Sequence, residues 1–267
     1  MRKILSKSIS ALASSVFALG VLSTVAMTDE KFDYEHEEEA QGVVHGAPEN
    51  QSESWTLAAG GRIYDTWWDA LDREKPGGTN PAYPATGKKS GANTWRCKEC
   101  HGWDYLGQDG IYSKGSHYTG IPGIKGAAGK QVSELAATLR DANHPYTRQM
   151  ISDDEMLRVA AFVSRGQVDM TKFIDMNTRK VKAGDNERGR EIFQTVCATC
   201  HGFDGKLLDW GAKGQHGYVG TEAADVPDEV MNKILNAHPG VQMVNLRAFP
   251  LEDAISVLSY AATLPAE

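Results

Sequence analysis

Two segments of the chain place cysteine and histidine at a spacing that can do chemistry. Residues 97–101 read CKECH, and residues 197–201 read CATCH. At the start of a helix, two thiols spaced in this way can each add to one vinyl group of a haem. The histidine that follows, His101 or His201, then lies under the ring plane as an iron ligand. The sequence therefore predicts two covalently bound haem c groups. The attachment residues use every cysteine in the chain: Cys97, Cys100, Cys197 and Cys200.

Three other kinds of site share part of this pattern. A bare Cys-x-x-Cys pair occurs in thioredoxin-like redox proteins, two such pairs can bind zinc, and four cysteines in an exported protein can form two disulfides. None of these sites requires a histidine directly after the second cysteine in both motifs. We therefore favour covalent haem over all three.

Charge and length limit the possible partners. The chain has 267 residues, with 28 basic and 35 acidic side chains and a formal net charge of −7 at pH 7. This length predicts one or two domains. An acidic surface disfavours nucleic acid and anionic membranes, and it favours docking against lysines of a redox partner protein. Simple solubility explains the same charge equally well.

The N-terminal region indicates export to the periplasm. Residues 1–26 combine a basic start, an apolar middle and small residues at the end, as is typical of a signal peptide. The uncharged stretch 8–28 is also long enough to be a membrane anchor, although its serines favour cleavage. The protein is expected to contact a membrane only if this segment is uncleaved. Residues 27–54 are acidic and polar, and we expect them to form a disordered leader.

The remainder of the chain contains an internal repeat. A glycine followed by apolar residues at helical spacing occurs before each motif, and the glycine predicts a close crossing of two helices. The first half carries an additional segment rich in proline and glycine between this pattern and the motif, which we expect to be an inserted loop. The repeated positions are Gly60, Ile63, Tyr64 and Trp67 in the first half, and Gly189, Ile192, Phe193 and Val196 in the second.

Both halves continue in the same order. Each motif is followed by a glycine-rich segment with a histidine, a helix that ends at a His-Pro pair, a methionine and a closing helix. A capping box, Ser152 to Glu155, starts the first closing helix, and Pro250 starts the second. The other repeated positions are His117 and His216 in the glycine-rich segments, His144 and His238 before the prolines, and Met150 and Met243 in the loops that follow.

This order of elements resembles that of a tandem class I c-type cytochrome, a dihaem protein of the periplasm. The resemblance implies an all-α fold with two cytochrome c-like haem domains and glycine-rich loops around the haems. The first domain would span 55–166 with its loop insertion, and the second 185–267. Residues 167–184 would form the linker.

Three pairs of residues compete for the distal iron position. Met150 and Met243 stand where the methionine ligand of the family stands, and they are the predicted ligands. His117 and His216 are the alternative and would give bis-histidine haems. The histidines beside the prolines are expected to cap helices or to contact propionates. The choice matters because methionine ligation raises the haem potential.

The resemblance implies a carrier of single electrons between respiratory redox partners, for example a periplasmic donor and a terminal oxidase. No catalytic residue is predicted, and a carrier is favoured over an enzyme. One alternative is a dihaem oxidoreductase, thiosulfate dehydrogenase-like or peroxidase-like. The other is a membrane-anchored cytochrome subunit of a respiratory complex.

Overall fold

The computed structural model describes residues 46–212 and 214–267, which belong to one compact unit. Within these ranges the β-type pairings are isolated bridges, at Gly107–Pro122 and Ile174–Val181. The prediction of an all-α fold is therefore confirmed for the described residues. No helix in the same ranges is long and apolar enough to cross a membrane. The predicted signal peptide and most of the predicted leader lie outside the described residues.

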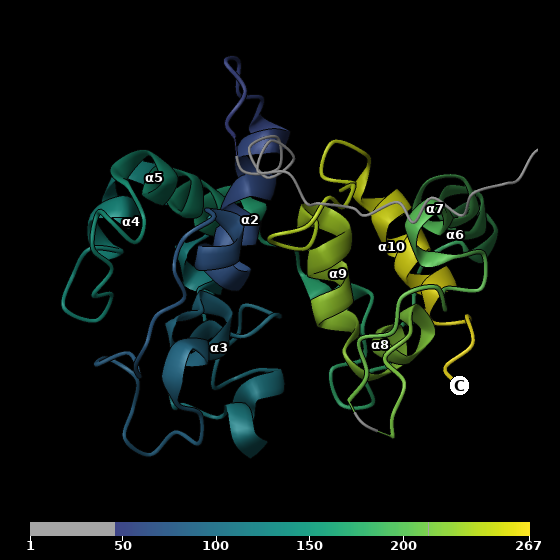
Figure 1. The fold of residues 1–267 in the computed structure, drawn as a ribbon, viewed down its shortest axis with the longest axis horizontal. Coiled ribbons are helices and arrows are strands. Elements are labelled where there is room, and N and C mark those ends of the chain that lie inside the picture. Colours follow the sequence, from purple (N-terminus) through teal and green to yellow (C-terminus); the bar gives the residue numbers. More distant parts are fainter. Residues whose placement is uncertain (1–45, 213) are drawn as a thin grey trace, which may run out of the picture. The chain divides into compact units, whose positions relative to one another are not determined.

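The helices follow one another along the chain, joined by long loops (Figure 1). The α-helices are α2 (Glu53–Ala70), α3 (Cys97–His101), α4 (Val132–Thr138), α5 (Asp153–Ala161), α6 (Asn186–Ile192), α7 (Ala198–His201), α8 (Val219–Asp225), α9 (Pro227–Asn236) and α10 (Leu251–Ala261). Two π-helical turns, Phe162–Gly166 and Phe193–Cys197, extend α5 and join α6 to α7. Short 3-10 turns occupy Gly91–Trp95, Ile111–Ser113, Gly115–His117, Lys125–Ala127 and Met170–Lys172.

Helix α2 buries the apolar face that the sequence predicts. Its first turn is capped by Ser52, whose hydroxyl accepts a hydrogen bond from a backbone N–H of that turn at 3.1 Å. Ile63, Tyr64 and Trp67, spaced along one side of the helix, are all buried. The helical conformation breaks at Thr66 (φ −148°, ψ 91°), close to the helix end. The aromatic face therefore anchors α2 in the core.

In both halves the first helix crosses the closing helix at a glycine. A Cβ added to Gly60 would lie 2.1 Å from the carbonyl oxygen of Arg158 in α5. A Cβ added to Gly189 would lie 1.9 Å from the carbonyl oxygen of Ser256 in α10. Side-chain carbons do not approach backbone oxygens so closely, so each crossing requires glycine. The prediction of close helix crossings is confirmed, and α6 and α10 lie side by side in Figure 1.

The closing helices also start as predicted. The Ser152 hydroxyl accepts a hydrogen bond from the N–H of Glu155 at 3.4 Å, and the Glu155 carboxylate accepts one from the N–H of Ser152 at 2.7 Å. This reciprocal pair is a capping box that satisfies two donors at the start of α5. Pro250 stands directly before α10, where its fixed φ suits the beginning of a helix.

The inserted loop of the first half folds against itself. Between α2 and α3 the chain forms turns and the single 3-10 helix Gly91–Trp95. The indole N–H of Trp95 donates to the carbonyl oxygen of Gly78 at 2.8 Å, and the N–H of Asn80 donates to the hydroxyl of Thr94 at 2.9 Å. The prediction of a loop is confirmed, and these bonds hold it beside the first motif.

The hydrophobic core is continuous across the two halves and includes the predicted linker. Met170, Phe173 and Ile174 of the linker are buried in the same cluster that contains the apolar faces of α2, α5, α9 and α10. The sequence indicated no role for Met170, because a single methionine in a polar stretch carries no periodic signal. The structure shows that this segment packs rather than simply connects.

Candidate functional site

Both cysteine motifs adopt the same backbone turn. Each ends a short helix, α3 or α7, at a glycine with positive φ: Gly102 has φ 79° and ψ 160°, and Gly202 has φ 78° and ψ 159°. Only glycine adopts this conformation without strain, and it reverses the chain directly after the histidine. The repeat found in the sequence is therefore also a repeat of local structure.

The four cysteines are free thiols in the structure. Burial raises the pKa of Cys97 and of Cys197 to about 11, and that of Cys100 to about 12. These groups are therefore protonated at neutral pH, unlike the low-pKa thiolates of thioredoxin-like pairs. Within the described residues, no three or more His, Cys, Asp or Glu side chains are arranged to hold a metal ion, so the four cysteines do not form one cluster.

A hydrogen bond at Nδ1 fixes the orientation of the His101 ring. Its Nδ1 lies 2.8 Å from the carbonyl oxygen of Pro122. Because a carbonyl oxygen only accepts, Nδ1 carries the proton and Nε2 keeps its lone pair. Burial also lowers the pKa of His101 and favours the neutral ring. A neutral histidine with its other N–H donated to a carbonyl is oriented as a metal ligand.

His201 is also buried enough to have a lowered pKa, but its ring is not fixed in the same way. Its Nδ1 is buried without a hydrogen-bond partner, and the ring lies against Trp210 with the two centroids 5.6 Å apart. The two motif histidines therefore share a backbone turn and the neutral state, while only His101 has its tautomer set by a partner.

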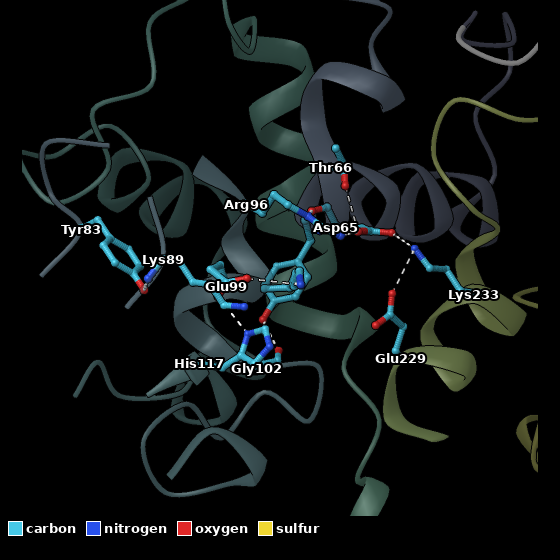
Figure 2. Close-up of polar contacts among 12 residues, drawn as sticks. Asp65, Thr66, Tyr83, Lys89, Arg96, Glu99, Gly102, His117, Glu229 and Lys233 are labelled. Carbon is cyan, nitrogen blue, oxygen red and sulfur yellow. Dashed lines mark hydrogen bonds and ion pairs between the residues drawn. The ribbon is translucent and has the colours of Figure 1, made fainter. Parts of the chain in front are cut away.

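The two histidines predicted as alternative distal ligands pair with carboxylates. The Nδ1 of His117 lies 2.9 Å from a carboxylate oxygen of Glu99, which Figure 2 shows, and the Nδ1 of His216 lies 2.7 Å from Asp209. Each ring also stacks on a tyrosine. One nitrogen of each ring is therefore already engaged.

The two predicted methionine ligands lie in the loops that precede the closing helices. Both side chains are partly buried. The carbonyl oxygen of Met150 accepts a hydrogen bond from Arg73 at 2.6 Å, and the N–H of Met243 donates to the carbonyl of Val241 at 3.0 Å. These contacts fix the backbone of the two loops, and the role of the sulfur atoms stays a prediction.

One histidine that was expected to cap a helix or to contact a propionate lies beside a motif histidine. The imidazole of His144 lies opposite that of His101, with ring centroids 6.2 Å apart and ring planes inclined by 23°. Its Nδ1 lies 3.1 Å from the carbonyl oxygen of Thr138 and 3.0 Å from a carboxylate oxygen of Asp141. The first motif therefore has a second imidazole beside it, and the repeated His-Pro pair was the signal for it.

The corresponding histidine of the second half is placed differently. The Nδ1 of His238 lies 2.7 Å from the carbonyl oxygen of Pro239, and the side chain lines an open pocket with Arg73 and Arg96 of the first half. The contact of His201 is with Trp210 rather than with this histidine. Although His144 and His238 are equivalent in the sequence repeat, their rings have different surroundings.

A buried ionic cluster joins the first motif to α9. Asp65, which is 3% exposed, accepts hydrogen bonds from Arg96, directly before the motif, and from Lys233 of α9 (Figure 2). The Nζ atoms of Lys233 and Lys98 both lie 5.2 Å from the ring centroid of Trp103. Burial alone would raise the pKa of Asp65, but Lys233 and Arg96 more than offset it and hold that pKa below its usual value.

Further hydrogen bonds strengthen the contact between the two halves. The hydroxyl of Tyr105 donates to the Oδ1 of Asn232 at 2.7 Å, and the Nδ2 of Asn232 donates to the carbonyl of Trp103 at 3.0 Å. A side-chain N–H of Arg247 donates to the carbonyl of Gly166 at 3.0 Å. Residues on both sides of the linker are therefore held together by polar contacts as well as by the core.

Exposed large apolar side chains concentrate near the second motif in the sequence. They belong to the segment around and after the motif and to the segment that contains Met243, and exposed apolar groups of this kind mark binding surfaces. These residues are Val196, Phe203, Leu207, Leu208, Trp210, Val241, Val244, Phe249 and Leu251. Within the described part of the first half, the exposed large apolar residues are Tyr118 and Leu157.

No protein-family model matches the chain, and no curated protein matches it significantly.

Proposed function

We propose that the chain is a periplasmic dihaem c-type cytochrome of the tandem class I kind. It would carry single electrons between respiratory redox partners. The observation that carries this proposal is the recurrence of one helical turn, ended by a glycine of nearly identical φ and ψ, at two Cys-x-x-Cys-His motifs. The two haem domains would be 55–166 and 185–267, each with its first and closing helices crossed at a glycine.

The residues present fit two covalently attached haems. Each attachment would add one S–H group across one vinyl group, and all four cysteines are free thiols that no disulfide occupies. The neutral rings of His101 and His201 are the form that binds iron. The exposed apolar side chains near the second motif would cover the ring of the haem attached there. When bound, each haem supplies a one-electron iron couple.

The other residues of the site position and shield these groups. The hydroxyl of Tyr64 donates to the carbonyl of Gly102 at 2.6 Å and holds the turn that follows His101. Trp103 and Tyr105, which follow this turn, are both buried, and the ring of Tyr105 packs edge-on against that of Tyr64. Met243 would complete the second iron, and a side chain from the segment between α4 and α5 would complete the first. If the chain fills every ligand position of both irons, neither iron can bind a substrate. Such a protein would be a carrier and not a dihaem oxidoreductase.

Carbon monoxide binding separates the carrier from the enzyme. We expect the reduced protein, purified from a host that matures c-type haem, to bind no carbon monoxide and to turn over neither peroxide nor thiosulfate. It should still exchange one electron per haem with a small redox protein. Carbon monoxide binding at one haem, together with turnover of either compound, would instead support a dihaem oxidoreductase.

A further inference from the structure

We propose that His144 is the distal ligand of the first iron, so that the first haem is bis-histidine and the second is ligated by histidine and methionine. The inference rests on the proposed function, because it requires a haem at the first motif. It replaces Met150 in the ligand set that the sequence predicts, and it leaves Met243 in place.

The distance between the two rings supports this assignment. Two imidazoles that bind one metal ion from opposite sides have ring centroids about 6 Å apart, because each metal–nitrogen bond is about 2 Å long and each centroid lies about 1 Å behind its nitrogen. The centroids of His101 and His144 are 6.2 Å apart. The observed separation matches the one expected for two ligands of one iron.

The partners of the two rings support it as well. A histidine that binds a metal usually donates its other N–H to a carbonyl or a carboxylate. His101 does so through Nδ1 to Pro122, and His144 does so through Nδ1 to Thr138 and Asp141. In both rings Nε2 is the nitrogen that remains available to a metal.

The turn around Asp141 explains why the ring of His144 is held in place. The Asp141 carboxylate accepts hydrogen bonds from the N–H of Asn143 at 2.8 Å and from the N–H of His144 at 3.1 Å, as well as contacting the ring. Pro145 follows directly and restricts the backbone of His144 to extended conformations. The side chain is therefore oriented before any metal binds.

The competing histidines lack this arrangement. His117 also contacts a carboxylate through Nδ1, but its ring stacks on Tyr112 and not beside His101. His238 lines a pocket with Arg73 and Arg96, and the ring contact of His201 is with Trp210. The two irons would therefore differ in ligand set, and the bis-histidine iron would have the lower potential because methionine ligation raises it. A low-potential and a high-potential haem in one chain would give electron flow a direction.

Four single variants of the full chain, purified with haem, test the ligand directly: Met150→Leu, His144→Ala, His144→Met and His117→Ala. We expect Met150→Leu and His117→Ala to leave both oxidised irons low-spin and the far-red sulfur-to-iron band unchanged. His144→Ala should convert one of the two irons to high spin. His144→Met should keep both irons low-spin and add a second sulfur-to-iron band.

The opposite spectra would overturn the assignment. A high-spin iron in Met150→Leu, or in His117→Ala, would name that residue as the ligand, and an unchanged spectrum in His144→Ala would exclude His144. If His144→Ala loses the first haem during maturation, the spectrum of His144→Met decides. The absence of a second sulfur-to-iron band in that variant would count against the proposal. The alkaline pyridine assay distinguishes failure of the ligand assignment from failure of the proposed function. Two haems per chain with spectra that differ from those expected would refute only the assignment of His144. A chain without haem would refute the proposed function too.

Discussion

Replacing Asp65 with asparagine is expected to lower the free energy of unfolding by about 3 kcal/mol at pH 7, within the range for breaking a buried ion pair. Asp65 is 3% exposed and pairs with both Arg96 and Lys233. Its loss leaves Arg96 without a carboxylate partner and leaves Lys233 with only the longer contact to Glu229, at 3.9 Å. Urea unfolding of the haem-containing protein, followed by circular dichroism, measures the change. Because Lys233 belongs to α9, the variant should also loosen the contact between the two halves.

The pH dependence of this effect has a definite sign. The folded-state pKa of Asp65 lies below its usual value of about 3.9. The stabilisation is therefore fully present above about pH 4 and is lost as the pH falls through the folded pKa. The gap in unfolding free energy between wild type and Asp65→Asn should be constant from pH 7 to pH 5 and shrink below pH 4.

An exposed ion pair provides the control. Glu53 and Arg165 interact at 2.7 Å with both side chains about half exposed, so Glu53→Gln should cost less than about 1 kcal/mol. An Asp65→Asn variant that loses no more than this control would contradict the structural role of the cluster. A gap that stays the same at pH 3 would contradict the lowered pKa of Asp65 in the folded protein.

Replacing Gly189 with alanine is expected to destabilise the second half by about 1–3 kcal/mol, in the range for overpacked sites. In a helix, replacing glycine with alanine by itself favours folding by about 0.5–1 kcal/mol. We expect a net loss of stability because the clash at the helix crossing costs more than this gain. The new Cβ would lie 1.9 Å from the carbonyl oxygen of Ser256 and 2.9 Å from the Cβ of Tyr260. The helices α6 and α10 must therefore separate, which a lower midpoint of thermal unfolding would report.

Gly77→Ala is the matched control, because a Cβ at Gly77 has nothing within 4 Å. We expect its unfolding midpoint to stay close to that of the wild type. If Gly189→Ala proves as stable as Gly77→Ala, the close crossing of α6 and α10 is wrong, and with it one of the features on which the proposed pair of haem domains depends.

Much of the fold could be predicted because its signals are local. The apolar spacing around Ile63 and Tyr64, the capping box at Ser152 and the proline before α10 each determine a helix or its first turn through neighbours a few residues apart. The glycines at the two crossings were also visible, because a glycine within an apolar helical face has few other uses.

What could not be predicted depends on contacts between distant residues. Helix α8, Val219–Asp225, has no apolar periodicity, and the sequence placed its start in an irregular glycine-rich segment. The partner of Asp65 lies 168 positions away on α9, and nothing in the sequence links the two. His144 and His238 occupy equivalent positions in the repeat, yet only His144 faces a motif histidine, because the packing of α9 against the first half sets the surroundings of His238.

The number of covalent haems per chain decides whether both Cys-x-x-Cys-His motifs attach haem. We would measure the intact mass of the protein purified from a host that matures c-type haem, together with the alkaline pyridine absorbance per chain. We expect two haems per chain. The number should fall to one in a Cys97→Ser, Cys100→Ser double variant, and to one in the matching variant at Cys197 and Cys200. A wild-type chain that carries no covalent haem, under conditions in which a known c-type cytochrome is matured, would contradict it.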